Sequence, residues 1–190
     1  MADPNEVVNF LGLSLTRREK DNLLSGMAAP AVRRLSPGTK LYRVADQGRA
    51  SSTTSKVDGE AGSWWFGKKA FGKILQYCLQ HDELGRGLGY AAREACAVLF
   101  GWSSCDLLIE AYTIGNVRIF YGKGNPQSEA GVTLPGWDDV DQWFIPGISE
   151  RVSSAGTTHT KLSAKGGAKI KVYRTSSVRS AMVSARSFKR

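Results

Sequence analysis

The stretch TKLYRVADQG, residues 39–48, places Arg43 in the middle of a short β-like run that ends in a turn. A guanidinium carries a lasting positive charge and offers planar pairs of N–H donors, which match the oxygens of a phosphate. Arg43 is therefore a candidate cation for a phosphate-binding site. The alternative is an exposed strand arginine whose charge stays in water, and these ten residues leave both interpretations open.

Three aromatic residues, Trp64, Trp65 and Phe66, follow one another in GSWWF. Successive residues of a strand face opposite sides, so at least one of the three must point away from the core. Paired tryptophans occur in cores and interfaces more often than as platforms for a ligand ring. Both roles stay open for this run.

The familiar catalytic patterns are absent. The segment GRGLGY opens a helix but follows no predicted strand, so it is not a dinucleotide fingerprint, and no phosphate-loop pattern occurs. His81 and His159 lie far apart without a serine or cysteine motif, which gives a hydrolase triad little support. Cys78, Cys96 and Cys105 form no CxxC pair. We expect buried, reduced thiols in a cytosolic protein, and no metal site.

Length and composition predict one globular domain with extensions. The 190 residues are 42% hydrophobic and 23% charged, and no apolar run approaches the length of a membrane span. The first ten residues lack a cationic segment before an apolar stretch, so no signal peptide is expected. We expect a soluble protein in the cytoplasm of the producing or of a target cell, with any export through a secretion system.

The net charge of +9 is unevenly distributed. All 17 acidic residues lie within residues 1–150, whereas the last 40 residues hold ten basic residues and no acid. Such a segment attracts polyanions through counterion release, or is a solvated tail. Inside it, GGAKIKVYR alternates like a strand with one wet face, and the following TSSVRSAMVSARSFKR predicts disorder or a helix that forms with a partner.

The elements that must position these residues begin with two predicted helices. DPNEVVNFLGL combines an N-cap aspartate, a proline at the first helical position and a glutamate in the capping-box position. LTRREKDNLLSGM predicts a second helix, capped by Thr16, with Leu23 and Leu24 facing inward. Residues 1–37 are therefore predicted to be a helical extension.

Downstream, a strand at 40–45 is followed by 17 residues of turn formers and hydroxyls, which predict a structureless loop. Helical spacing of apolar residues predicts helices over 68–80 and 90–100. Two β-rich runs joined near Gly115 and Asn116 predict a hairpin. After a second glycine-rich loop, DQWFIPG predicts a short strand.

The order of these motifs resembles that of the NAD-consuming toxin domains of the ADP-ribosyltransferase superfamily. LYR on a strand, GSWW, a helix, YGKGNPQ, LPGW and DQWFIP follow one another over residues 39–146. The similarity is to domains at the C-termini of bacterial polymorphic and Rhs toxins and to the necrotizing NAD-glycohydrolase group. It implies an α+β fold: a split, bent β-sandwich of ADP-ribosyltransferase type, with N-terminal helices (1–37), an NAD-binding catalytic domain (38–150) and a basic C-terminal extension (151–190).

The resemblance also implies how NAD would be held. Arg43 matches the first-strand arginine that clamps the dinucleotide phosphates in that family. Trp64 or Trp65 matches the aromatic wall against which the nicotinamide packs. Ser63 matches the serine of the arginine-serine-glutamate class better than the hydroxyl run at 51–55, which follows Arg43 too closely.

Two stretches compete for the catalytic role that the resemblance implies. In PQSE, Gln127 and Glu129 have the spacing of the transferase motif, in which the glutamate orients the ribose and the glutamine recognises the acceptor. In DQWFIP, Gln142 lines up with the glutamine of the necrotizing-toxin group, which is mainly hydrolytic. We prefer Gln142, because the first pair lies in a glycine-proline loop. Glu150 is a further candidate.

The implied enzyme cleaves NAD+ at the nicotinamide–ribose bond and transfers ADP-ribose to a protein or RNA. An NAD+ glycohydrolase that releases free ADP-ribose is the alternative. The resemblance further implies an immunity or antitoxin protein as a partner. Two non-catalytic classes stay open: a nucleic-acid-binding module acting through residues 151–190, and a virion assembly protein.

Overall fold

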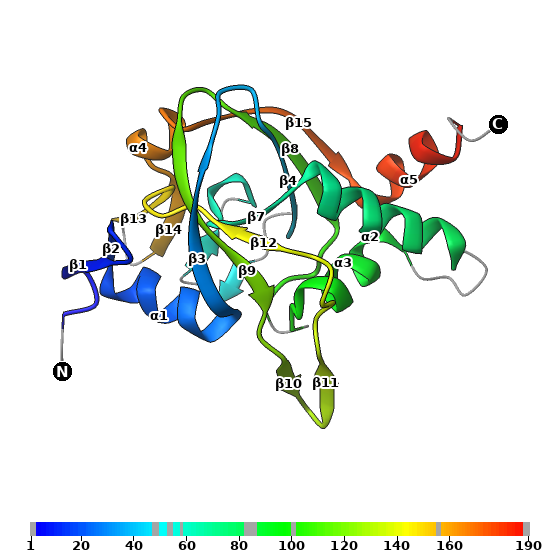
Figure 1. The fold of residues 1–190 in the computed structure, drawn as a ribbon, viewed down its shortest axis with the longest axis horizontal. Coiled ribbons are helices and arrows are strands. Elements are labelled where there is room, and N and C mark those ends of the chain that lie inside the picture. The colour runs from blue at the N-terminus through cyan, green and yellow to red at the C-terminus, as the bar shows by residue number, and fades with distance from the viewer. Residues whose placement is uncertain are drawn as a thin grey trace.

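The computed structural model describes residues 3–46, 50–52, 55–57, 59–81, 87–99, 102–154 and 157–187. Its centre is a sheet of seven strands in which every neighbouring pair is antiparallel (Figure 1). With helices packed beside it, the fold is mixed α and β, as predicted. In sheet order the strands are β15 (Ile170–Ser177), β8 (Leu107–Thr113), β4 (Lys40–Ala45), β7 (Trp64–Gly67), β12 (Gln142–Phe144), β9 (Val117–Gly124) and β3 (Met27–Leu35).

The sheet is bent, so that strands from its two ends share one core. Leu35 and Ile119, from β3 and β9, lie in the same buried cluster as Leu41 and Ile109, from β4 and β8. Figure 1 shows the two loops at the top of the view through which the chain passes between these ends, from β3 to β4 and from β8 to β9.

The predicted hairpin of residues 107–124 is wrong, because β8 and β9 are not neighbours in the sheet. A two-residue hairpin turn of the favoured type needs a left-handed backbone, and neither Gly115 nor Asn116 has a positive φ. The end of β8 bonds elsewhere: Thr113 accepts from the Gly38 N–H at 2.7 Å and donates its own N–H to Thr39 at 3.0 Å. Both predicted strands are present, but the residues of the connecting loop do not determine which strands they pair with.

The first predicted helix is also wrong. Residues 7–16 form a hairpin of β1 (Val7–Phe10) and β2 (Leu13–Thr16). Its turn has Leu11 at φ 49° and Gly12 at φ 77°, the backbone that a tight hairpin requires. The hairpin therefore forms in place of the helix that the capping pattern at residues 3–6 predicted.

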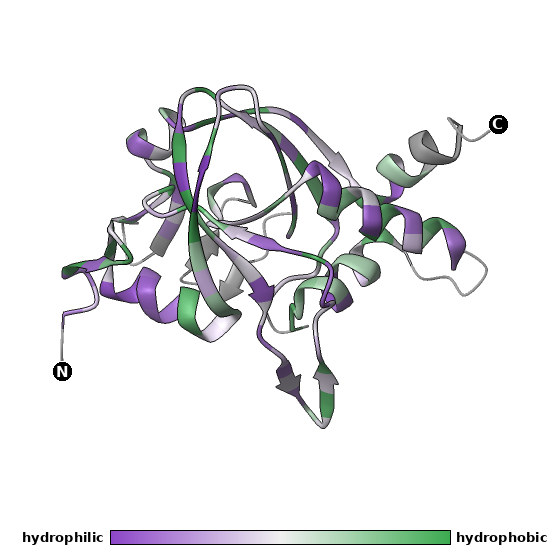
Figure 2. Cartoon of the chain, viewed as in Figure 1, coloured by the Kyte–Doolittle hydropathy of each residue, from purple (hydrophilic) through white to green (hydrophobic). Residues whose placement is uncertain are grey.

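The second helix is confirmed as α1 (Arg17–Gly26). Thr16 caps it in a reciprocal capping box: its hydroxyl accepts from the Glu19 N–H at 3.2 Å, and Glu19 accepts from the Thr16 N–H at 2.9 Å. Leu23 is fully buried, whereas Leu24 is 42% exposed, so only one of the two leucines faces inward. Figure 2 shows the helix hydrophilic at its start and hydrophobic towards its end.

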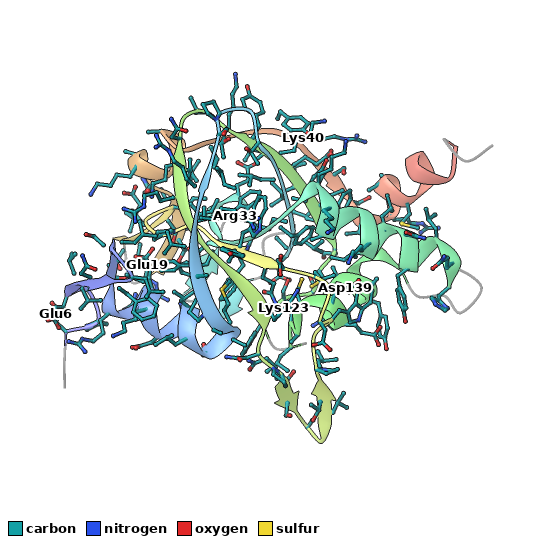
Figure 3. The ribbon with its side chains drawn as sticks, viewed as in Figure 1. Glu6, Glu19, Arg33, Lys40, Lys123 and Asp139 are labelled. Carbon is teal, nitrogen blue, oxygen red and sulfur yellow. The ribbon has the colours of Figure 1, made fainter. Side chains whose placement is uncertain are left out.

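Glu19 also fastens α1 to the body. Its carboxylate accepts from the Gly147 N–H at 2.6 Å, in the turn after β12 (Figure 3). Because β3 follows α1 directly and is a strand of the main sheet, residues 1–37 are not an all-helical extension. The domain boundaries remain a prediction.

Two helices cover one side of the sheet, α2 (Lys68–Gln80) and α3 (Leu88–Cys96), close to their predicted ranges. A third, α5 (Val178–Ser187), packs on them through Val178 and Met182, and the Met182 sulfur lies 3.5 Å from that of Cys78. Of the two alternatives predicted for residues 175–190, disorder is wrong for the described part, and the helix is present and packs on the protein's own core. Residues 188–190 lie outside the described residues. Two buried side chains in a weakly periodic segment hold the helix in place.

The remaining basic segment is folded as well. β13 (Ser149–Ser154) and β14 (Thr157–Leu162) form a second sheet with β6 (Ser55–Val57) and β5 (Ala50–Ser52). Strands β5 and β6 and the 3-10 turn η1 (Gly59–Ala61) lie in the stretch predicted to be structureless, parts of which fall outside the described residues.

After the short helix α4 (Ala164–Gly167), β15 joins the main sheet with Ile170 buried and Lys171 exposed, as its alternation predicted. Residues 151–154 and 157–187 are thus part of the fold rather than a solvated tail. None of the described helices is long and apolar enough to cross a membrane.

Candidate functional site

A cavity of 570 Å³ lies where α1, α3 and the strands β4, β7, β10, β12 and β13 meet, and its volume lies in the range of small-molecule sites. It gathers five of the seven predicted site residues, which come from four separate strands. These five are Arg43, Trp64, Trp65, Gln127 and Gln142.

Arg43 lies on β4, and its side chain is half-buried at the wall of the cavity. One of its terminal nitrogens donates to the Trp64 carbonyl at 2.8 Å. The guanidinium lies so close to Gly62 that a Cβ there would overlap it. Burial lowers the pKa of Arg43 to about 10, while Cys105 and Asp46 raise that pKa in part. The side chain is therefore a fixed cation at neutral pH.

The two tryptophans of β7 face opposite sides of the sheet, as strand geometry predicts. Trp65 is 1% exposed, packs in the main core and donates its indole N–H to Gly62 at 2.8 Å. Trp64 is half-buried and meets Phe144 edge-on, with ring centroids 5.1 Å apart at 78°. Both side chains border the cavity, but only Trp64 is exposed enough for a ligand ring to pack against it.

Gln142 begins β12 and is 5% exposed. Its Nε2 donates to the carbonyl of Cys96, the last residue of α3, at 2.9 Å. Gly124 of β9 leaves the room for this amide, because a Cβ at that position would overlap Nε2. The hydrogen bond fixes the side chain of Gln142 at the cavity.

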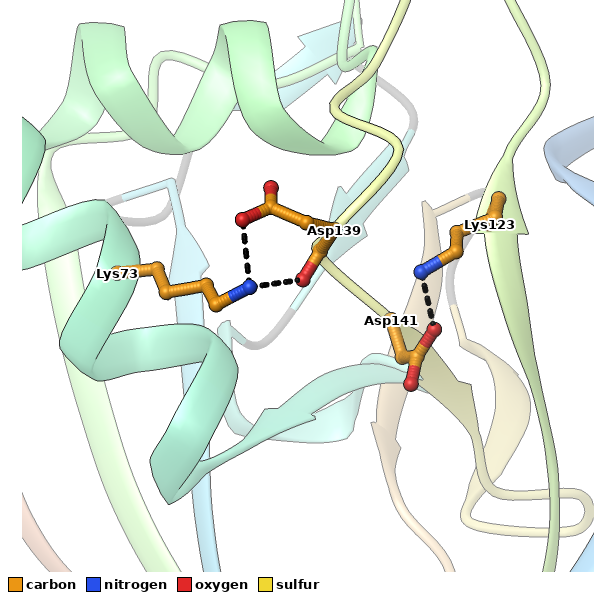
Figure 4. Close-up of polar contacts among 4 residues, drawn as sticks. All are labelled: Lys73, Lys123, Asp139 and Asp141. Carbon is orange, nitrogen blue, oxygen red and sulfur yellow. Dashed lines mark hydrogen bonds and ion pairs between the residues drawn. The ribbon is translucent and has the colours of Figure 1, made fainter.

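The segment that leads into β12 is fastened on both sides (Figure 4). Lys73 of α2 forms an ion pair with Asp139 at 2.5 Å and also donates to the Asp139 carbonyl at 2.9 Å. Lys123 of β9 forms an ion pair with Asp141 at 2.8 Å. Each pair is partly exposed and worth little by itself. Together they hold the chain immediately before Gln142.

Gln127 has a structural task in addition to its place at the cavity. It lies on β10 (Gln127–Glu129), which forms a hairpin with β11 (Val132–Leu134) rather than the predicted loop. Its Nε2 donates to the Ser25 carbonyl at 2.9 Å, and Asn125 donates to the same carbonyl at 3.2 Å. Two side-chain amides thus satisfy carbonyls at the end of α1.

The other candidates are not among the cavity's lining residues. Glu129 lies on β10 next to the tight turn. Ser63 adjoins Trp64, and its carbonyl accepts from the Ile145 N–H at 2.9 Å. Glu150 lies on β13 and pairs with Lys161 at 3.4 Å. The geometry therefore groups Arg43 with Gln142 rather than with Glu129.

Several lining residues carried no signal in the sequence. Trp102 lies in the loop after α3, and Arg151 reaches the cavity from the second sheet. Cys96 and Cys105 also line it. Cys78 and Cys105 are buried, as expected, whereas Cys96 is half-buried. This part of the cavity wall is formed by the loop between α3 and β8. The types of its residues gave no indication in the sequence that they would line a cavity.

Burial sets the reactivity of these thiols. It raises the pKa of Cys96 to about 12 and also raises that of Cys105. Because the thiolate is the reactive form, we expect Cys96 of the folded protein to be alkylated at pH 8 more slowly than an ordinary thiol, by about tenfold or more. Iodoacetamide labelling with peptide mapping measures this rate, and labelling in urea is the control. Rapid modification of Cys96 in the folded protein would contradict the burial described above.

No family model and no curated protein matches the sequence. Among solved structures, the chain is similar to Rhs1-CT in complex with its cognate immunity protein RhsI1, at 13% identity over 73% of this chain and 81% of that chain, with a TM-score of 0.40. It is also similar to Tne2 in complex with Tni2, at 13% identity over 77% and 95%, with a TM-score of 0.37. Likeness at this level carries no argument about function, which must rest on the residues of the cavity.

Proposed function

We propose that the protein cleaves NAD+ at the nicotinamide–ribose bond, as a toxin domain of ADP-ribosyltransferase type. One observation carries the proposal: a single cavity gathers Arg43, Trp64 and Gln142, three residues from separate strands that the sequence resemblance had selected. A dinucleotide substrate could use the cation to bind its phosphates, the aromatic side chain to pack against a ring, and the amide to orient its ribose.

Arg43 would bind the pyrophosphate. Its guanidinium can approach two phosphate oxygens with parallel N–H groups, and it stays protonated at neutral pH. The bond to the Trp64 carbonyl orients it before substrate arrives, which reduces the entropy lost on binding. Arg151, an exposed cation at the same cavity, would add a weaker electrostatic attraction.

Trp64 would pack against the nicotinamide and Gln142 would lie near the ribose. The bond from ribose C1′ to the nicotinamide nitrogen breaks, its electron pair leaves with the neutral nicotinamide, and positive charge develops on the ribose. The amide oxygen of Gln142 would orient the ribose hydroxyls and stabilise that charge. Water or a target hydroxyl then attacks C1′ and loses a proton.

Gly62 offers a test of the Arg43 position. We expect Gly62→Ala to displace the guanidinium and to lower NAD+ turnover about tenfold or more, since small misplacements in a site are costly. Gly72→Ala is the matched control, because a Cβ on this exposed α2 residue meets open space. Steady-state nicotinamide release and circular dichroism of both variants check the prediction. Equal activity of the two variants would contradict it.

The acceptor of ADP-ribose decides between transfer and hydrolysis. NAD+ labelled in its adenylate is incubated with the protein and a whole-cell extract, and free ADP-ribose, labelled protein and labelled RNA are separated. Label on a macromolecule supports a transferase, and free ADP-ribose alone supports a glycohydrolase. Intact NAD+ in every fraction would contradict both.

An immunity or antitoxin partner is part of this proposal, on the sequence resemblance. Nucleic-acid binding is a second candidate, favoured by the exposed cations of the folded C-terminal part, Arg151, Lys165, Lys171 and Arg179. A binder of that kind loses affinity steeply with salt and does not respond to NAD+. Titration of RNA at two ionic strengths, with and without NAD+, separates the two.

A further inference from the structure

Trp102 stands out among the residues of the cavity. It is 55% exposed, although it lines a cavity, and it comes from the loop after α3. Trp64 borders the same cavity from β7, where it packs against Phe144 and lies over Gly26 of α1, 2.6 Å from the place of a Cβ. Two indole rings from unrelated elements therefore border one space.

The described backbone on either side of Trp102 is anchored by hydrogen bonds. Arg93 of α3 is 3% exposed and donates to the Val98 carbonyl at 2.9 Å and to the Ser103 carbonyl at 2.5 Å. The Trp102 N–H donates to the Leu99 carbonyl at 3.0 Å. A buried arginine thus ties down the backbone on both sides of the indole.

Asp46 fastens the same loop to the end of β4. Its carboxylate accepts from the Ser103 hydroxyl at 3.3 Å and from the Ser104 N–H. Ser103 and Cys105 of this segment line the same cavity as Arg43. Trp102 therefore stands on an anchored segment and lines the same cavity as the guanidinium of Arg43.

We propose that Trp102 is the stacking platform for the adenine base of the bound dinucleotide. The proposal rests on the function given above, and names a subsite for the half of NAD+ that Trp64 and Gln142 leave unassigned. NAD+ has a planar ring at each end of a pyrophosphate, and a cavity with an aromatic side chain on two walls and a cation suits that outline. Adenine stacks on indole without needing a matched hydrogen-bond pattern.

The test compares Trp102→Ala and Trp102→Phe with the wild-type protein by calorimetry. We expect Trp102→Ala to weaken binding of ADP-ribose and of AMP by about 5- to 100-fold, and Trp102→Phe to keep most of the affinity. Nicotinamide mononucleotide, which lacks adenine, should bind Trp102→Ala as it binds the wild type. Tyr173→Ala is the control for loss of an exposed aromatic outside the lining residues.

The outcomes separate this proposal from the proposed function. If the wild type releases no nicotinamide from NAD+, yet Trp102→Ala selectively weakens ADP-ribose, the subsite stands and the reaction fails. If NAD+ is cleaved but folded Trp102→Ala binds ADP-ribose normally, the subsite is overturned and the reaction stands. Equal weakening of AMP and of nicotinamide mononucleotide, or no binding of ADP-ribose to the wild type, also overturns the subsite.

Discussion

Replacing Arg43 by alanine is expected to abolish nicotinamide release while the protein stays folded. The guanidinium is a half-buried cation that donates a hydrogen bond to the Trp64 carbonyl. Without it, a pyrophosphate bound in the cavity would lose the positive charge that is already fixed in place before binding. Removing one such preorganised electrostatic contact costs about 10²–10³ in turnover. Chromatographic quantification of nicotinamide, with circular dichroism and thermal melting of the variant, measures both parts of the prediction.

Arg34→Ala is the matched control, because Arg34 is an exposed strand arginine on β3. It should keep wild-type turnover. Arg43→Lys should recover only part of the activity, since an ammonium is a point charge without the planar fork. Normal nicotinamide release from folded Arg43→Ala would mean that Arg43 is only a structural arginine and that the phosphate is held elsewhere.

Replacing Gln142 by alanine is expected to lower kcat about a hundredfold, with a smaller change in KM. The amide is placed by its bond to the Cys96 carbonyl and would act on the ribose as charge develops. The same change leaves that carbonyl without its partner, so the free energy of unfolding should also fall by about 1–3 kcal/mol. Single-turnover kinetics and urea unfolding separate the two effects.

Glu129→Ala is the discriminating comparison for this prediction. Glu129 is not a lining residue of the cavity, so its removal should leave kcat unchanged. If Glu129→Ala inactivates the protein and Gln142→Ala does not, the catalytic assignment is wrong and the transferase-type pair with Gln127 is the functional motif.

Sequence patterns predicted correctly those elements that are determined by residues close together in the chain. α1 begins at Thr16 because the capping box lies within four residues, and the sequence displays both partners. The turn at Leu11 and Gly12 was missed because a left-handed leucine is not a turn signal by residue type. The prediction that β8 pairs with β9 was wrong, because each strand pairs with partners from elsewhere in the chain. The two residues at the loop between them carry no information about those partners.

The family pattern named several residues that the fold brings to one cavity, and also Ser63 and Glu129, which do not line it. Arg43, Trp64 and Gln142 share one cavity, although 78 residues separate Trp64 from Gln142 and no periodicity links them. Trp102 and the Cys96 carbonyl were missed, because a loop tryptophan and a backbone oxygen carry no motif. The packing of α5 onto the core was missed for a related reason: Val178 and Met182 alone give little hydrophobic periodicity, yet their burial anchors the helix.

The most direct measurement is the fate of NAD+ mixed with purified wild-type protein and, in parallel, with folded Arg43→Ala. The cavity described above predicts free nicotinamide in the first sample, in excess of the protein concentration, and none above background in the second. NAD+ recovered intact from the wild-type sample, at substrate concentrations in the millimolar range and with extract supplied as a source of acceptors, would contradict the central claim.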